Sequence, residues 1–178
     1  MFVFTNEIFY ADKYNELPRV KDIYVVNADG TGLKRVGEFG HHPLWHPDCR
    51  RILANAEFPG RPKLSMVLYD TETGERSLAT QAIAGMGHPS YSPDGRWIAA
   101  DYVLPGEGGA SLLVVDALTD TAYDVLHMGV LNHSHTGTHL HPAWSWDSQE
   151  LLVASDASGR AQLVVVNIDD VMRVKGIE

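Results

Sequence analysis

Short apolar runs of strand length recur along the chain, each bounded by aspartate or glycine. Runs rich in valine and leucine that lack a sustained helical period are typical of buried β-strands. The C-terminal segment 169–178 fits either a last strand or a short helix. The clearest apolar runs lie at 23–26, 66–69, 112–115 and 163–166.

A His-Pro pair opens three segments that align with one another without gaps. The pairs begin at His42, His88 and His141, which are 46 and 53 residues apart. After each pair come a short strand, a turn containing aspartate, and an apolar strand. Aspartate supplies a local hydrogen bond in such turns, while proline and glycine provide the required backbone angles. The spacing matches the roughly 40 to 50 residues of a four-stranded propeller blade.

The repeats predict an all-β chain made of about three and a half to four four-stranded antiparallel β-propeller blades. We expect residues 1–178 to form one propeller segment, with a partial blade at about 1–38 and blades at about 39–84, 85–130 and 138–178. An open blade edge is an aggregation hazard. The segment is therefore expected to belong to a larger propeller or to one completed by a second copy.

Composition narrows the range of partners. The formal net charge is −9 and the sequence pI is about 5.4, which argues against nucleic acid and anionic membranes as partners. Cys49 is the single cysteine, so no intrachain disulfide forms. The N-terminal residues lack the basic and apolar regions of a secretion signal, and a cytoplasmic location is expected.

The repeated histidines are the main candidates for chemistry. Equivalent positions on the innermost strands of successive blades converge on the propeller axis, so His42, His88 and the His139/His141 pair are expected to meet. Several imidazoles can bind a borderline divalent ion, and a free imidazole can accept a proton near neutral pH. The alternative is that His-Pro simply starts a strand and that each imidazole hydrogen-bonds to the backbone of a neighbouring blade.

Two segments resemble the TolB-type propeller repeat, namely 22–32 (DIYVVNADGTG) and 92–99 (SPDGRWIA). That resemblance implies a propeller fold, and such repeats occur in scaffolds and enzymes alike. It therefore leaves open a noncatalytic segment that binds protein partners.

A narrower resemblance is to the C-terminal blades of oligogalacturonate lyase, through the three His-Pro pairs and the sequence His139-Leu140-His141-Pro142. It implies metal-assisted β-elimination on an oligogalacturonide or other uronate sugar, with a divalent metal that is typically manganese. Matching motifs make His88, His139 and His141 the metal ligands, His42 the base and Arg19 a substrate-binding residue. This chain has Thr136 where that family has a glutamine ligand.

The other histidine, aspartate and aromatic residues that stand out in the sequence are interpreted as structural. We expect His41 and His46 to be structural or at the rim, and His127 to be at the surface. His133 and His135 are interpreted as part of a polar loop. The recurring Asp101 and Asp156 are expected to cap turns between strands. Trp45, Tyr91 and Trp144 share one register and are expected to pack between blades.

Overall fold

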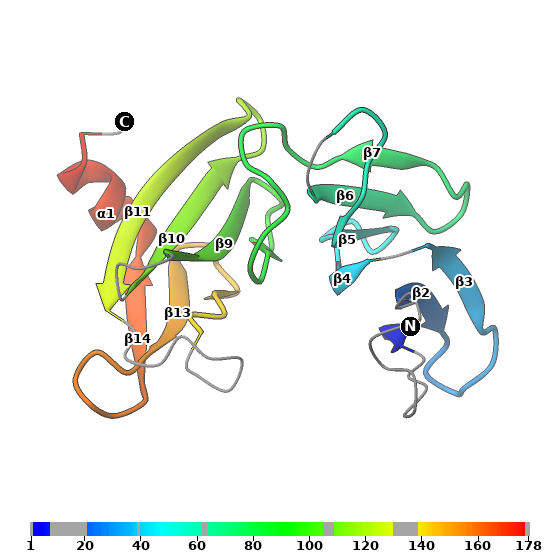
Figure 1. The fold of residues 1–178 in the computed structure, drawn as a ribbon, viewed down its shortest axis with the longest axis horizontal. Helices are drawn as coiled ribbons and strands as arrows, with labels where there is room; N and C mark the ends of the chain where they lie inside the picture. The colour runs from blue at the N-terminus through cyan, green and yellow to red at the C-terminus, as the bar shows by residue number, and fades with distance from the viewer. Residues whose placement is uncertain are drawn as a thin grey trace, which may run out of the picture.

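The computed structural model describes residues 2–7, 21–38, 40–61, 64–104, 109–129 and 139–176. These residues form four antiparallel sheets that follow one another in chain order (Figure 1). In every sheet the strands also pair in chain order, so each sheet is a simple meander. This is the repeated all-β arrangement that the sequence predicts.

The outer two sheets have three described strands and the middle two have four. We call these sheets the first to the fourth blade. The first contains β1 (Phe2–Glu7), β2 (Lys21–Val26) and β3 (Lys34–Gly37). The second contains β4 (His41–Trp45), β5 (Arg51–Ala56), β6 (Ser65–Asp70) and β7 (Arg76–Leu78). The third contains β8 (Ser90–Tyr91), β9 (Trp97–Leu104), β10 (Gly109–Asp116) and β11 (Thr121–Gly129). The fourth contains β12 (Ala143–Trp144), β13 (Glu150–Ser155) and β14 (Gln162–Asn167).

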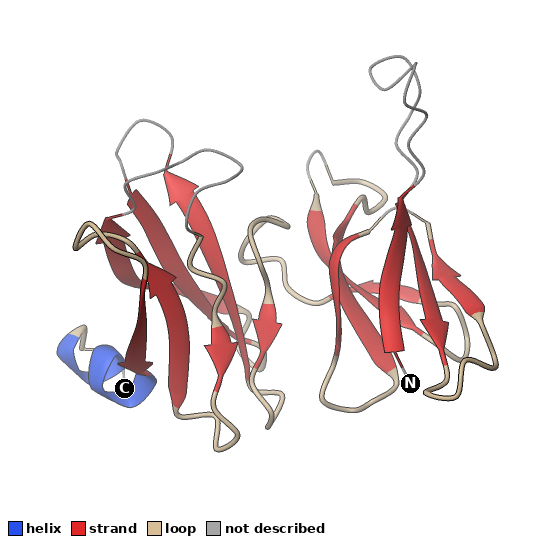
Figure 2. Cartoon of the chain, turned by 90° about the horizontal axis from the view of Figure 1, so that it is seen from below, coloured by secondary structure: helices blue, strands red, loops and turns tan. Residues whose placement is uncertain are grey.

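The C-terminal segment forms a helix, which decides between the two structures that its sequence allowed. Helix α1 (Ile168–Val174) directly follows β14 and is drawn in blue in Figure 2. Asn167 caps it, because its side-chain oxygen accepts the Asp170 N–H at 3.0 Å. Ile168 and Met172 are buried in the core shared by the third and fourth blades. Among the described residues, no helix has the length and apolar character needed to cross a bilayer.

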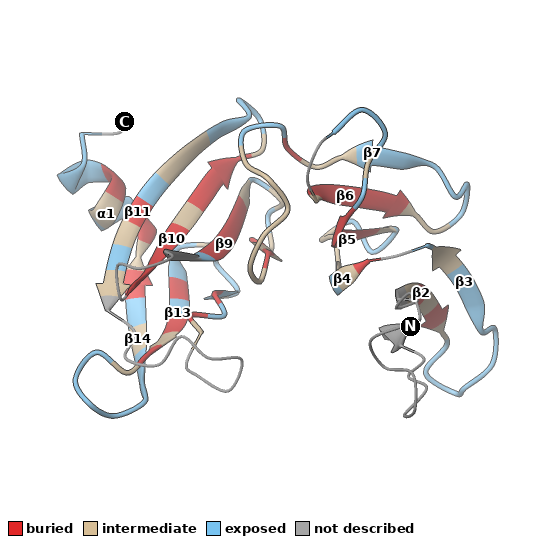
Figure 3. Ribbon diagram, viewed as in Figure 1, coloured by how far each residue is buried: buried red, intermediate tan, exposed pale blue. Residues whose placement is uncertain are grey.

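Apolar side chains are buried between successive blades. Figure 3 colours the buried residues red, and many of them lie on the strands. Side chains alternate between the two faces of a strand. On β5, Ile52 and Ala54 therefore pack toward the first blade, while Leu53 packs toward the third. On β9, Ile98 packs toward the second blade and Ala99 toward the fourth. Each middle blade is thus apolar on both faces.

The innermost strands β8 and β12 of the last two blades lie side by side, and β4 of the second blade lies against β1 of the first. The aromatic residues of β4, β8 and β12 pack between blades, as predicted. Trp45 packs against the core of the first two blades, and Tyr91 belongs to the core of the second and third. Trp144 donates its indole N–H to the Ser90 carbonyl at 3.1 Å and so joins the last two blades.

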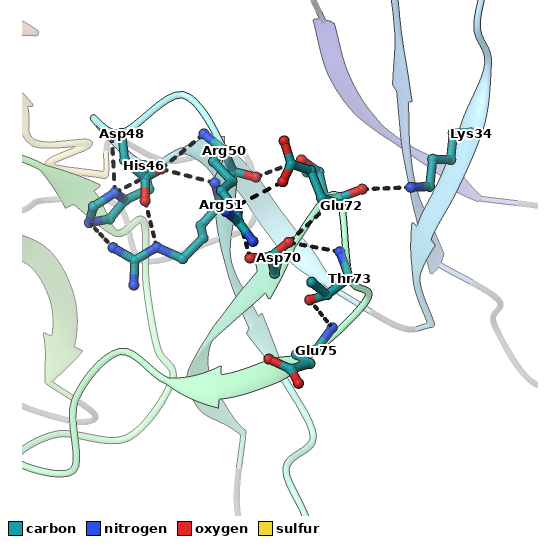
Figure 4. A network of polar contacts seen from close by, with 10 residues as sticks. Lys34, His46, Asp48, Arg50, Arg51, Asp70, Glu72, Thr73 and Glu75 are labelled. Atoms are coloured by element: carbon teal, nitrogen blue, oxygen red, sulfur yellow. Dashed lines mark hydrogen bonds and ion pairs between the residues drawn. The ribbon is translucent and has the colours of Figure 1, made fainter.

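Aspartates stabilise the turn after each innermost strand. The Asp48, Asp94 and Asp147 carboxylates each accept a backbone N–H two residues ahead, at 2.9, 3.0 and 3.2 Å. In the second blade this turn continues into a network of ion pairs (Figure 4). There Arg50 donates to Asp70 at 2.7 Å, and Lys34 of the first blade donates to the Thr71 carbonyl at 2.6 Å.

One face of the fourth blade is open. Leu152 on β13 pairs with Val165 on β14, and the two side chains are 38% and 58% exposed. Leu163 on the same sheet is 70% exposed. In a propeller this face packs against a neighbouring blade, because only contact between blades removes such a surface from water.

We predict that Leu53→Ala lowers the free energy of unfolding by about 2–5 kcal/mol, because it leaves a cavity between the second and third blades. Leu53 is fully buried, whereas Leu118 is 81% exposed. Urea denaturation should therefore show almost no change for Leu118→Ala. Equal losses in the two variants would contradict the assignment of a core between these blades.

Candidate metal centre

Histidines from three consecutive blades meet in one cluster. His42 lies on β4 of the second blade, His88 lies just before β8 of the third, and the His139/His141 pair lies just before β12 of the fourth. The ring centroids of His42 and His88 are 4.5 Å apart, and those of His88 and His141 are 3.5 Å apart. His139 lies 5.3 Å from His88 and 5.8 Å from His141. The predicted convergence of these four residues is therefore present.

Three of these imidazoles form a donor set that fits a metal ion. His88, His139 and His141 each offer a ring nitrogen, and the three nitrogens lie within 4.8 Å of one another. Metal–imidazole distances are about 2.0–2.1 Å, so small side-chain rotations bring all three donors to one ion. His88 and His139 are half-buried, whereas His141 is exposed, so the donor set has an open side for a ligand.

The spacing of the fourth-blade pair has a simple packing cause. Leu140, between the two histidines, is 1% exposed and belongs to the core of the third and fourth blades. Its carbonyl accepts the Ala154 N–H at 2.8 Å, which ties this segment to β13. Anchoring Leu140 in the core places both neighbouring imidazoles near His88.

A buried carboxylate lies behind the cluster. Asp101 is 2% exposed, and its Oδ1 accepts the His88 backbone N–H at 2.6 Å. Both Asp101 oxygens lie 3.0 Å from His88 Nδ1. Oδ2 also accepts the backbone N–H of His141 at 3.1 Å. One side chain therefore contacts two members of the donor set.

The interpretation of Asp101 as a turn cap is wrong. Asp101 lies within β9, where it pairs with Leu112 of β10, and its side chain is on the face that packs toward the fourth blade. The sequence did contain a signal for this position. Asp101 comes two residues after Ala99, which places its carboxylate on the same buried face of an apolar strand. Asp156, in contrast, does begin a turn, because its carbonyl accepts the Gly159 N–H at 2.8 Å.

The backbone around the histidines is held in unusual conformations. His42 and His141 have φ angles of 53° and 44°, although each precedes a proline. Such left-handed conformations cost non-glycine residues about 1–3 kcal/mol and persist where surrounding packing enforces them. Gly87 also has a positive φ of 54°, and an added Cβ would lie 1.7 Å from the Asp101 carbonyl oxygen. Only glycine allows His88 to approach Asp101 this closely.

The environment favours the neutral rings of His42 and His141. Burial, together with the nearby charges of protonated His88, His41 and His141, lowers the pKa of His42 to about 4, although part of its surface is exposed. Burial and His88 also lower the pKa of His141. Burial alone would raise the pKa of Asp101, but the hydrogen bonds and charge of His88 outweigh it and lower that pKa. Neutral imidazoles carry the lone pairs that metal ligation requires.

The other histidines of the described chain lie apart from the donor set. His46 accepts the Asp48 N–H at 3.1 Å and packs against the Tyr91 ring, which confirms its structural role. His127 is exposed on β11, as predicted. Four residues of the sequence-based hypotheses lie outside the described residues, namely Arg19, His133, His135 and Thr136.

Comparison with known proteins gives structural matches alone. The sequence matches no protein-family profile and no curated protein. TolB from Acinetobacter baumannii matches with a TM-score of 0.67 at 19% identity, over 93% of this chain and 39% of its own. An oligogalacturonate lyase in complex with manganese matches with a TM-score of 0.66 at 21% identity, over 96% of this chain and 50% of its own. The chain is built of β-propeller blades.

A third similar structure is the oligogalacturonate lyase from Vibrio parahaemolyticus, with a TM-score of 0.63 and 19% identity. It matches over 84% of this chain and 46% of its own. The propeller segment thus spans between 39% and 50% of the length of these three proteins. At these identities the likeness establishes the fold, and the predicted fold class is confirmed.

We predict that Gly87→Ala destabilises the protein by about 2–5 kcal/mol, the sum of a positive-φ penalty and a steric clash with Asp101. Gly60 is the matched control, because its φ is 78° and an added Cβ meets nothing within 4 Å. Gly60→Ala should cost only the backbone penalty of about 1–2 kcal/mol. Equal losses in chemical denaturation would contradict the close approach at Gly87.

Proposed function

We propose that this chain carries the metal centre of an oligogalacturonate lyase-like polysaccharide lyase, which cleaves a uronate sugar by β-elimination. The convergence of three imidazole donors within 4.8 Å, with His42 against them, carries the proposal. A noncatalytic scaffold has no use for such a donor set. The similar lyase structure in complex with manganese supports the choice of reaction and of metal.

His88, His139 and His141 would hold the ion. When bound, a divalent ion there would neutralise the substrate carboxylate and make the hydrogen on the adjacent carbon more acidic. Imidazole donors also suit zinc and nickel, so the test compares these two metals with manganese. The exposed side of His141 leaves room for the carboxylate to approach.

His42 is suited to take the proton. Its ring lies beside His88, outside the three-nitrogen set, and its lowered pKa keeps the ring neutral with a free lone pair. The C–H electron pair forms a double bond to the next carbon as the glycosidic C–O bond there breaks. The leaving oxygen takes a proton from solvent water and becomes a hydroxyl, and His42 gives the proton taken from carbon to the hydroxide that remains. Arg19 remains the residue predicted to bind the substrate.

We predict that the purified chain binds manganese or a similar divalent ion, one per chain, and that the His88→Ala/His141→Ala double variant loses this binding. Removing two of three imidazoles leaves too few donors to hold an ion. Isothermal titration of metal-free protein with manganese, zinc and nickel measures the affinities.

His127→Ala is the matched control for the metal titration, since His127 is an exposed histidine outside the cluster. Its affinity should equal that of the unmodified chain. An unmodified chain that binds none of the three metals would overturn the metal centre and leave a protein-binding propeller scaffold as the interpretation.

We predict that His42→Ala lowers the rate of unsaturated product formation from oligogalacturonides by about 10²–10⁴-fold, the usual contribution of a general base. Metal affinity should stay unchanged, because His42 is outside the donor set. The ultraviolet absorbance of the unsaturated uronate follows the reaction, and His46→Ala is the control. A His42→Ala variant with full activity would exclude His42 as the base.

A further inference from the structure

We infer that Asp101 is a positioning residue for the cluster, which fixes the ring tautomer of His88 and the backbone position of His141. Its effect on metal affinity rests on the proposed function, whereas its effect on the His88 tautomer can be measured without any metal.

The contacts of Asp101 join two blades at the donor set. Its Oδ1 accepts the His88 backbone N–H at 2.6 Å and its Oδ2 accepts the His141 backbone N–H at 3.1 Å. The His88 ring is fixed as well, because Nδ1 lies 3.0 Å from each oxygen. Loss of this carboxylate would release a ring on the third blade and a backbone segment on the fourth.

These contacts determine which His88 nitrogen is free. An ionised carboxylate has no proton to donate and can only accept hydrogen bonds. Nδ1 must therefore carry the proton, and Nε2 keeps the lone pair. A carboxylate that accepts the second N–H of a metal-binding histidine fixes its tautomer and makes it a better donor. Asp101 is placed to accept the Nδ1–H of His88 in this way.

The residue of the second blade that is equivalent to Asp101 shows that a contact with the backbone of the next blade does not require a carboxylate. Asn55 lies on β5 at the position that Asp101 occupies on β9, 46 residues earlier. The Asn55 amide also reaches the following blade, where Nδ2 donates to the Gly87 carbonyl at 2.9 Å. A neutral amide thus suffices to join two blades. Asn55 makes this contact with the backbone, whereas the Asp101 carboxylate also contacts the His88 ring.

Burial adds a second argument. A buried carboxylate costs stability unless it is paired and hydrogen-bonded, and an apolar or amide side chain would avoid that cost. Asp101 is 2% exposed, and both of its oxygens are used by the two histidines. A charged group at this cost, whose side-chain hydrogen bonds are directed at the donor set, serves the orientation of that set.

The first test is a ¹⁵N NMR spectrum of the histidine rings in the metal-free protein at slightly alkaline pH. His88 should be the Nδ1–H tautomer, and a His88→Gln variant assigns its signals. An Nε2–H tautomer of His88 would overturn the inference. This measurement needs no variant of Asp101, so it decides even where Asp101→Asn fails to fold.

The second test compares Asp101→Asn with Asp116→Asn. Asp116 is a buried carboxylate of the same sheet that pairs with Trp97, at the other end of β9, and it accepts the Leu118 N–H at 2.8 Å. Asp101→Asn puts an N–H donor opposite a donor of His88 or His141. We expect it to mix the His88 tautomers and to weaken manganese binding by about 10–100-fold. Asp116→Asn should change neither quantity.

The outcomes separate this inference from the proposed function. An Asp101→Asn protein with unchanged His88 tautomer and unchanged manganese affinity would overturn the positioning role and leave the metal centre intact. An unmodified chain that binds no metal, yet shows the Nδ1–H tautomer and its loss in Asp101→Asn, would overturn the proposed function and support the positioning of His88.

Discussion

Apolar packing between successive blades is the interaction on which the rest of the structure depends. The middle blades present apolar side chains on both faces, as Ile52 and Leu53 do on β5. Each blade therefore needs a neighbour on either side, and this need arranges the four sheets in chain order. It also brings equivalent positions of successive blades together, so the His42 and His88 rings, 46 positions apart, and the His88 and His141 rings, 53 positions apart, become neighbours.

The histidine cluster is a consequence of that packing. Forming the cluster also costs free energy. His42 and His141 adopt positive φ angles, and Asp101 is a carboxylate removed from water. The apolar cores on either side offset these costs. Leu140 shows the connection directly, because the same residue that fills the core of the last two blades separates the two imidazoles that the fourth blade contributes to the cluster.

Much of this arrangement could be predicted from the sequence, because the repeats fix equivalent positions. The His-Pro register predicts the meeting of His42, His88 and His141, and the shared aromatic register predicts packing between blades. Asp101 was missed because its role depends on how far β9 extends and on which face of that strand meets the next blade. A turn cap and a buried strand carboxylate look alike in one sequence. The C-terminal helix depends on the Asn167 cap and on burial of Met172, which apolar pattern alone does not decide.

The most direct test of the account is an anomalous difference map from a crystal of the protein soaked in manganese, recorded at the manganese absorption edge. We expect one strong peak, bounded by the rings of His88, His139 and His141, with His42 beside it. A peak coordinated by surface carboxylates alone, or no peak at the histidines, would contradict the claim that consecutive blades build one metal centre.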